Sequence, residues 1–195
     1  YAEKGIVHLT FEFDCENPSF TSLSGGKSAN MVCDYCQASA PENKALLEQL
    51  GLEYAEGNVI SRGKSAHGST PEKGVNAIEK MLDYLNLTNI KDMLFNRAFG
   101  LTELQDETGR LTFSPDIIKY ENGKIFVTCD VRYPATYKLK DVLSIVDAQG
   151  VPYVIEHEQA PLFNDKNCFL IKTLNDVYNE VTGKDAKPVA IGGGT

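Results

Sequence analysis

The feature that most constrains the fold is the dipeptide Asn122-Gly123, which lies between two segments of alternating apolar residues. Asn-Gly suits the two positive φ angles of a type I′ turn, so it predicts a β-hairpin over residues 117–133. Because the turn sets the register, each residue of the second strand is assigned to one face of the sheet. The core face carries Ile125, Val127, Cys129, Val131 and Tyr133. The opposite face carries Phe126, Thr128, Asp130 and Arg132.

Helical and extended patterns alternate along the rest of the chain. Apolar residues at helical spacing predict helices at 41–51, 70–85, 89–95, 139–146 and 170–181. Alternation with a period of two predicts strands, which cover 6–13, 59–66 and 151–155. Residues 102–112 are polar and are expected to form a loop. These elements predict an α+β fold in which antiparallel sheets carry helices packed on one face.

A break in these patterns at Pro161 predicts a boundary between a domain over residues 1–160 and a second segment over 161–195. The sequence begins at Tyr1 without an initiator Met and ends in a glycine run. We therefore expect both ends to continue into a longer protein.

Charge and composition narrow the classes of function. A net charge of −8 without a cluster of basic residues disfavours binding to nucleic acid. No apolar run approaches the roughly 20 residues that a membrane helix requires. The five cysteines are an odd number without the spacing of a disulfide framework, which favours a reducing, cytoplasmic location. Cys33 and Cys36 have the spacing of half a zinc site, but no second pair completes it, so we expect ordinary buried thiols.

His67 lies in a segment that joins a predicted strand to a predicted helix. Thr70 is a suitable N-cap and Pro71 suits a first helical turn, so the helix is expected to begin directly after this histidine. An anchored loop of this kind can hold a catalytic imidazole. A single histidine in a loop is, however, more often a surface residue, so the residues around it must decide between the two interpretations.

Those surrounding residues, 63–77, resemble the signature of the lid, or dimerisation, domain of the co-catalytic zinc exopeptidase family. This family includes PepV-type dipeptidases, aminoacylases and glutamate-releasing carboxypeptidases. Four further segments resemble the PepV-like branch, and together the matches span nearly the whole chain. They are Tyr1–Gly5, Ser24–Val32, Asp130–Pro134 and Ala190–Thr195.

The resemblance implies a role for each matching residue. His67 would donate a hydrogen bond to the oxyanion, Asn30 would contact the substrate, and Arg132 would bind the substrate carboxylate. The backbone amides of Gly192, Gly193 and Gly194 would lie near the same carboxylate. In this family the metal ligands lie before the lid and after the glycine loop. Two divalent ions, zinc or alternatively manganese or cobalt, are therefore expected outside this chain, and His8 and His157 are expected to be exposed strand residues, not ligands.

The implied activity belongs to a larger parent protein. That parent would hydrolyse a dipeptide with a metal-activated water, the lid would close over its own catalytic domain, and the fragment alone would be inactive. An enlarged lid with two pseudo-repeated halves implies a monomeric parent, although the isolated fragment could self-associate. Two alternatives stay open: the lid of an aminoacylase or carboxypeptidase of the same family, and a non-catalytic α+β dimerisation or ligand-binding module.

Overall fold

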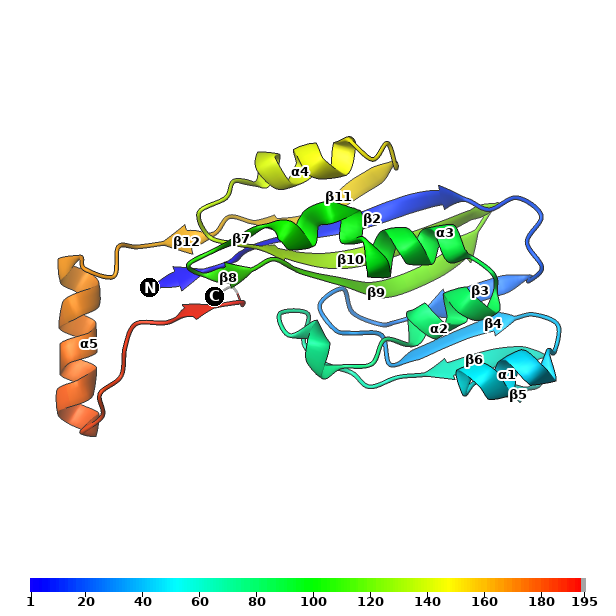
Figure 1. The fold of residues 1–195 in the computed structure, drawn as a ribbon, viewed down its shortest axis with the longest axis horizontal. Coiled ribbons are helices and arrows are strands. Elements are labelled where there is room, and N and C mark those ends of the chain that lie inside the picture. Colours follow the sequence, from blue (N-terminus) through cyan, green and yellow to red (C-terminus); the bar gives the residue numbers. More distant parts are fainter. Residues whose placement is uncertain (194–195) are drawn as a thin grey trace.

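The structure, a computed structural model, describes residues 1–193 and is built around one eight-stranded sheet (Figure 1). The strand order is β11-β2-β10-β9-β3-β4-β6-β5, and all neighbouring strands are antiparallel. The strands are β2 (Gly5–Asp14), β3 (Ser22–Gly25), β4 (Tyr35–Ser39), β5 (Glu53–Ala55), β6 (Asn58–Arg62), β9 (Thr112–Glu121), β10 (Lys124–Tyr133) and β11 (Tyr153–Gln159).

The predicted hairpin is confirmed and forms the centre of the sheet. Asn122 and Gly123 both have positive φ angles, of 51° and 78°, and they join β9 to β10. The first strand begins at Thr112, earlier than the hairpin pattern predicts. A β-bulge interrupts the pairing, because Thr128 lies opposite Ile117 while the next residue of β10 lies opposite Pro115. The residue left over is Asp116, which the alternation pattern alone cannot reveal.

Helices cover one face of the sheet, which confirms the predicted α+β class. The helices are α1 (Lys44–Leu50), α2 (Ala77–Tyr84), α3 (Thr88–Lys91) and α4 (Leu139–Asp147). Helix α2 packs on β4 and β6, and α4 packs beside the 3-10 segment η3 (Ala98–Glu103). Side chains from β2, β10 and these helices form one continuous apolar core, in which Phe11 stacks on Phe99 at a centroid distance of 4.3 Å.

The helix expected over residues 70–85 begins later than predicted. Pro71–Lys73 form only a 3-10 turn (η1), and the Thr70 side chain makes no capping bond. Helix α2 begins at Ala77, with the Asn76 side chain accepting a hydrogen bond from the Ile78 amide. The later start has a structural reason. Val75 pairs with Lys64 in an antiparallel β-bridge, with backbone hydrogen bonds in both directions at 2.8 and 2.9 Å. An extended Val75 cannot also belong to a helix.

Two other predictions at 89–112 are partly wrong. The helix expected at 89–95 is a short α3 followed by a π-helical turn, η2 (Asp92–Asn96). The loop expected at 102–112 contains the end of η3 and a small ribbon of β7 (Gln105–Asp106) and β8 (Gly109–Arg110). Polar side chains stabilise this ribbon, since Asp106 accepts hydrogen bonds from both Thr108 and Thr136. Polarity here reflects side-chain hydrogen bonds within the ribbon and to Thr136 rather than irregular backbone.

Beyond residue 161 the chain forms an arm that projects from the sheet (Figure 1). Its main element is α5 (Phe169–Thr182), which ends at Gly183 in the left-handed conformation, as the sequence predicts. The arm is joined to the N-terminus by a three-stranded sheet of β12 (Leu162–Phe163), β1 (Ala2–Glu3) and β13 (Ala190–Ile191). The boundary near residue 160 stays a prediction, and residues 2–3 pair with the segment beyond it.

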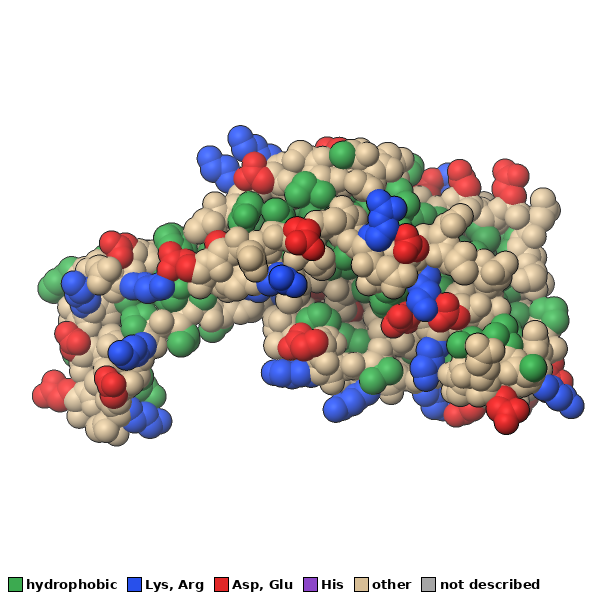
Figure 2. Space-filling model, in the orientation of Figure 1, with side chains coloured by type: hydrophobic (Ala, Val, Ile, Leu, Met, Phe, Trp, Pro, Cys, Tyr) green, Lys and Arg blue, Asp and Glu red, His purple; other side chains and the backbone are tan. Residues whose placement is uncertain are grey.

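Apolar side chains of the arm lie at the surface (Figure 2). No residue of α5 is buried, and Phe169 is 85% exposed. No helix among residues 1–193 is long and apolar enough to cross a membrane.

Candidate functional site

The candidate site lies on the sheet face opposite the helices, where β2 and β10 run side by side. Strand pairing places His8 opposite Asp130 and Ile6 opposite Arg132. Because directly opposed residues share a face, these four side chains all leave the sheet on the side that the helices do not cover. The prediction that Asp130 and Arg132 face away from the apolar core is therefore confirmed.

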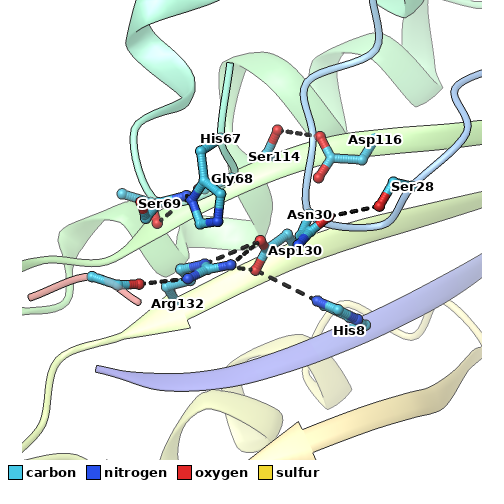
Figure 3. Close-up of polar contacts among 12 residues, drawn as sticks. His8, Ser28, Asn30, His67, Gly68, Ser69, Ser114, Asp116, Asp130 and Arg132 are labelled. Atoms are coloured by element: carbon cyan, nitrogen blue, oxygen red, sulfur yellow. Dashed lines mark hydrogen bonds and ion pairs between the residues drawn. The ribbon is translucent and has the colours of Figure 1, made fainter. Parts of the chain in front are cut away.

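Arg132 and Asp130 form a buried ion pair on this face (Figure 3). The Arg132 Nε donates to both carboxylate oxygens of Asp130, at 3.2 and 3.0 Å, and its Nη2 donates at 2.9 Å. The third nitrogen, Nη1, donates to the carbonyl oxygen of Gly192 at 2.6 Å. The Arg132 residue is only 3% exposed and Asp130 is fully buried. The pair therefore anchors the glycine loop to the sheet.

His67 lies on a loop that is bonded to the segment carrying Asn30. The Val32 amide donates to the Ala66 carbonyl at 2.9 Å, and the Gly68 amide donates to the Asn30 carbonyl at 2.7 Å. These two bonds hold residues 66–68 alongside 30–32. The loop is thus fixed on both sides of the histidine while the imidazole itself stays exposed.

The hydrogen bonds of the imidazole define which nitrogen carries the proton. The backbone amide of Ser69 donates to His67 Nδ1 at 3.2 Å, and the Ser69 hydroxyl lies 2.8 Å from the same atom. An N–H group can only donate, so Nδ1 must be the acceptor, and the proton of the neutral ring is on Nε2. Nε2–H is therefore the donor that His67 can offer to a ligand.

Four of the predicted residues meet in one hollow of about 200 Å³. The hollow is lined by Ile6, His8, Asn30, His67, Arg132, His157 and Gly193. Asn30 is partly exposed and its side-chain oxygen accepts from the Ser28 hydroxyl at 2.6 Å. Gly192 lies beside the hollow through its contact with Arg132, whereas Gly194 lies outside the described residues. A larger hollow of about 410 Å³, between Pro71 and Phe113, contains none of the predicted site residues.

His8 and His157 also line this hollow, which the sequence interpretation missed. His8 was expected to be an exposed strand residue, but its side chain is 17% exposed and its Nε2 lies 3.9 Å from Asp130 Oδ1. Its ring lies 5.2 Å from that of His157 on the neighbouring strand β11. Burial lowers the pKa of His8, and the nearby Asp130 carboxylate opposes this shift. His157 is exposed, as expected, yet all three histidines of the chain converge on one hollow.

A second buried carboxyl group lies behind the site, on the bulge of β9. Asp116 is fully buried, and its Oδ1 accepts a hydrogen bond of 2.5 Å from the Ser114 hydroxyl (Figure 3). Its other oxygen has no hydrogen-bond partner among residues 1–193. Burial raises the pKa of Asp116 to about 8, with a further contribution from the Asp130 charge. At neutral pH this carboxyl group is therefore mostly protonated.

The described residues do not present a metal site. Within residues 1–193, no three side chains of His, Cys, Asp or Glu are arranged to hold a metal ion. Cys33 and Cys36 are buried, and burial raises the pKa of Cys33 to about 11. A thiol with such a pKa is a poor metal ligand, because the thiolate is the form that binds.

Comparison with known proteins identifies the family. Residues 53–149 match the peptidase dimerisation domain, so the chain carries the dimerisation domain of the M20 peptidase family. The matched region contains β5 to α4 and includes both His67 and Arg132.

The relatives of this chain are described as dipeptidases and metallohydrolases. A putative dipeptidase of Staphylococcus epidermidis is 30% identical across the whole of this chain and 51% of its own length. A putative dipeptidase of Staphylococcus haemolyticus is 26% identical over the same shares. A metallohydrolase of Methanocaldococcus jannaschii is 31% identical over 69% of this chain and 38% of its own. The chain thus spans about half the length of the curated dipeptidases that it matches.

Among solved structures, the aminoacylhistidine dipeptidase of Vibrio alginolyticus aligns with all of this chain and 52% of its own. The sequence identity is 11% and the TM-score is 0.43. At that score the superposition assigns no residue roles.

Proposed function

We propose that this chain is the lid portion of a metal-dependent dipeptidase and that the hollow around Arg132 receives the substrate. The observation that carries the proposal is the convergence of His67, Asn30, Arg132 and Gly193 from four separate segments. These four residues lie far apart in sequence, so no local pattern brings them together. The names of the relatives support the reaction class.

In this proposal His67 stabilises the oxyanion that develops on the scissile carbonyl. The Ser69 amide keeps Nδ1 as an acceptor, so Nε2–H is always available as the donor. A neutral donor that is already oriented needs little reorganisation during the reaction. Asn30 offers a side-chain amide beside it, because its oxygen is already engaged by Ser28 and its NH₂ group stays available.

Arg132 binds the C-terminal carboxylate of the dipeptide. Its guanidinium has five N–H donors, of which the Asp130 and Gly192 contacts do not use all. The planar group suits a carboxylate, and its orientation is already set by Asp130. Backbone amides of Gly192, Gly193 and Gly194 complete the carboxylate site in this proposal.

The remaining parts of the proposal concern the whole protein. Residues outside this chain would bind two divalent ions, zinc or alternatively manganese or cobalt. Residues outside this chain would also supply the catalytic base. We place the protein in the cytoplasm and expect the fragment alone to be inactive. The boundary near residue 160 would separate the lid from the return into the catalytic part. The matched dimerisation domain favours self-association of this chain. We nevertheless expect the whole parent protein to be a monomer, because its lid would already contain a single large sheet of eight strands.

The test is a dipeptide hydrolysis assay on the whole protein that carries this chain. We expect activity to be lost with a chelator and restored by zinc, manganese or cobalt. The variant His67→Ala should lower kcat by about 100-fold or more with little change in KM, as expected for a donor that acts on the oxyanion. Ser65→Ala, in the same loop and exposed, is the matched control and should retain activity. If His67→Ala retained kcat/KM within a few-fold of the wild type, the oxyanion assignment would be wrong.

A further inference from the structure

His8 and His157 have no role in the function proposed above, although both line the substrate hollow. They come from neighbouring strands, β2 and β11, and their rings are in contact at 5.2 Å. The Nε2 atom of His8 is buried and has no hydrogen-bond partner within residues 1–193. It lies 3.9 Å from Asp130, the carboxylate that holds Arg132. A buried nitrogen without a partner costs free energy, so its position requires an explanation.

The explanation comes from the charges around Arg132. In the free protein the positive charge of Arg132 is already matched by the buried carboxylate of Asp130. A substrate carboxylate placed on Arg132 would add a second negative charge to a poorly solvated site. Two negative charges with a single positive one are unfavourable where water is largely excluded. A further positive charge next to Asp130 would offset this cost when the carboxylate binds.

Within reach of Asp130, His8 is the group that can supply this charge. The charged and titratable groups that act on His8 are Asp130 and Arg132 on β10 and His157 on β11. Glu158 follows His157 in sequence, but it pairs with a core-facing residue of β2 and so leaves the sheet on the other face. Glu156 is the unpaired residue of a bulge in β11 and is exposed. Among residues 1–193, the acidic group that acts on His8 is Asp130.

We propose that His8 completes the carboxylate site by taking up one proton when a carboxylate binds to Arg132. The proton goes to Nε2 of His8, which then pairs with Asp130. The Asp130 carboxylate then interacts with both His8 and Arg132, so the ion pair with Arg132 is weaker. The guanidinium is therefore available to the ligand. The His157 ring lies 5.2 Å from the His8 ring, and the charge of His157 opposes protonation of His8. The inference rests on the proposed function only in that Arg132 binds a carboxylate.

The expected pH dependence follows from the sign of proton uptake. Burial holds the pKa of His8 below its ordinary value in the free protein, so the ring is neutral near pH 7. The bound carboxylate raises this pKa. Between the free and bound values, each ligand bound takes up a proton, so its affinity falls by up to about tenfold for each unit of rising pH. The pH range in which binding takes up a proton therefore begins below the ordinary pKa of histidine and extends to higher pH.

The experiment measures binding in the whole protein after removal of metal with a chelator, so that metal coordination does not contribute. The probes are N-acetyl-L-alanine, which carries a carboxylate, and N-acetyl-L-alaninamide, which does not. Calorimetric titration in two buffers of different ionisation enthalpy reports proton uptake directly. We expect about one proton to be taken up with the carboxylate near pH 7 and none with the amide. No binding of the carboxylate at any pH, or binding without proton uptake, would overturn the inference.

Variants identify the residue that takes up the proton. His8→Gln should remove proton uptake and flatten the pH dependence of the carboxylate affinity between pH 5.5 and 8. His157→Phe should retain the uptake, because the charge of His157 opposes protonation of His8. Val154→Phe places the same ring on an exposed position of β11 outside the hollow and serves as the matched control. Proton uptake unchanged in His8→Gln would contradict the assignment. These outcomes do not depend on hydrolysis, so the inference and the proposed function can fail separately.

Discussion

Gly68 lies directly over the buried carboxylate of Asp130, so that a Cβ atom on this residue would come within 2.1 Å of Asp130 Oδ2. The contact connects the loop of His67 to the ion pair that orients Arg132. Asp130 is fully buried and held by three hydrogen bonds from Arg132, so it cannot move aside easily. The glycine that follows His67 is therefore required by close packing, and not by a positive φ angle.

Substitution of Gly68 should disrupt catalysis by moving the loop. In Gly68→Ala the added methyl group must displace either the loop or Asp130. We expect kcat/KM for a dipeptide to fall by about 100-fold, because a displacement near 1 Å can cost that much at a catalytic group. Ser65→Ala is again the control within the same loop. Wild-type activity in Gly68→Ala would show that the loop adapts without moving His67.

Breaking the ion pair should destabilise the protein strongly. Asp130→Ala leaves the Arg132 guanidinium buried without a countercharge, which typically costs about 3–5 kcal/mol. The free energy of unfolding from urea denaturation measures this change. Glu53→Gln breaks the exposed pair between Glu53 and Arg62 and should change stability little. Equal effects of the two substitutions would mean that burial of the Asp130 pair has no energetic consequence.

The buried carboxyl of Asp116 should make stability depend on pH. Its pKa is about 8 in the folded protein, far above the ordinary value, so the folded state binds a proton that the unfolded state releases above pH 4. Stability should therefore fall as the pH rises from about 4 to 8, with a slope of at most about 1.4 kcal/mol per unit.

The matching variant is Asp116→Asn, which has the shape of the protonated acid and cannot ionise. Urea denaturation at pH 5 and pH 8 should show a smaller loss of stability in this variant than in the wild type. An identical pH dependence in both proteins would assign the effect to other groups.

The tautomer of His67 can be measured directly. The Ser69 amide donates to Nδ1, so nitrogen NMR should show the proton of the neutral ring on Nε2. In Ser69→Ala the backbone amide remains, so the same tautomer should persist while the hydroxyl contact is lost. We expect a loss of activity of only a few-fold in this variant. A proton on Nδ1 in the wild type would remove the basis for the oxyanion assignment.

Much of the fold could be predicted because it depends on local chemistry. The Asn122-Gly123 turn, the amphipathic pattern of α5 and its end at Gly183 all act within a few residues. The start of α2 could not be predicted in this way. Thr70 and Pro71 form a good helix start by themselves, but the pairing of Val75 with Lys64 competes for the same backbone.

The same division applies to the candidate site. His67 and Arg132 could be proposed from their motifs, and alternation placed Arg132 on the correct face of the strand. Neither motif contains any sign that Arg132 is buried or that the Gly192 carbonyl accepts from it. His8 was missed because it looks like an ordinary polar strand residue. Its importance depends on being opposite Asp130, which is 122 positions further along the chain (130 − 8 = 122).

The sequence by itself determined the hairpin and the α+β class, and it supplied the residues that we propose to bind or polarise a substrate, because turn chemistry, periodicity and side-chain functional groups are local properties. The tertiary structure alone decided which of them meet. Strand pairing brought His8 and His157 to Arg132, and hydrogen bonds between the His67 loop and residues 30–32 brought His67 there. Packing of the His67 loop and the glycine loop excluded water from the Asp130 pair. Charge, burial and proton affinity are properties of that assembled environment, and they arise only when distant segments come together.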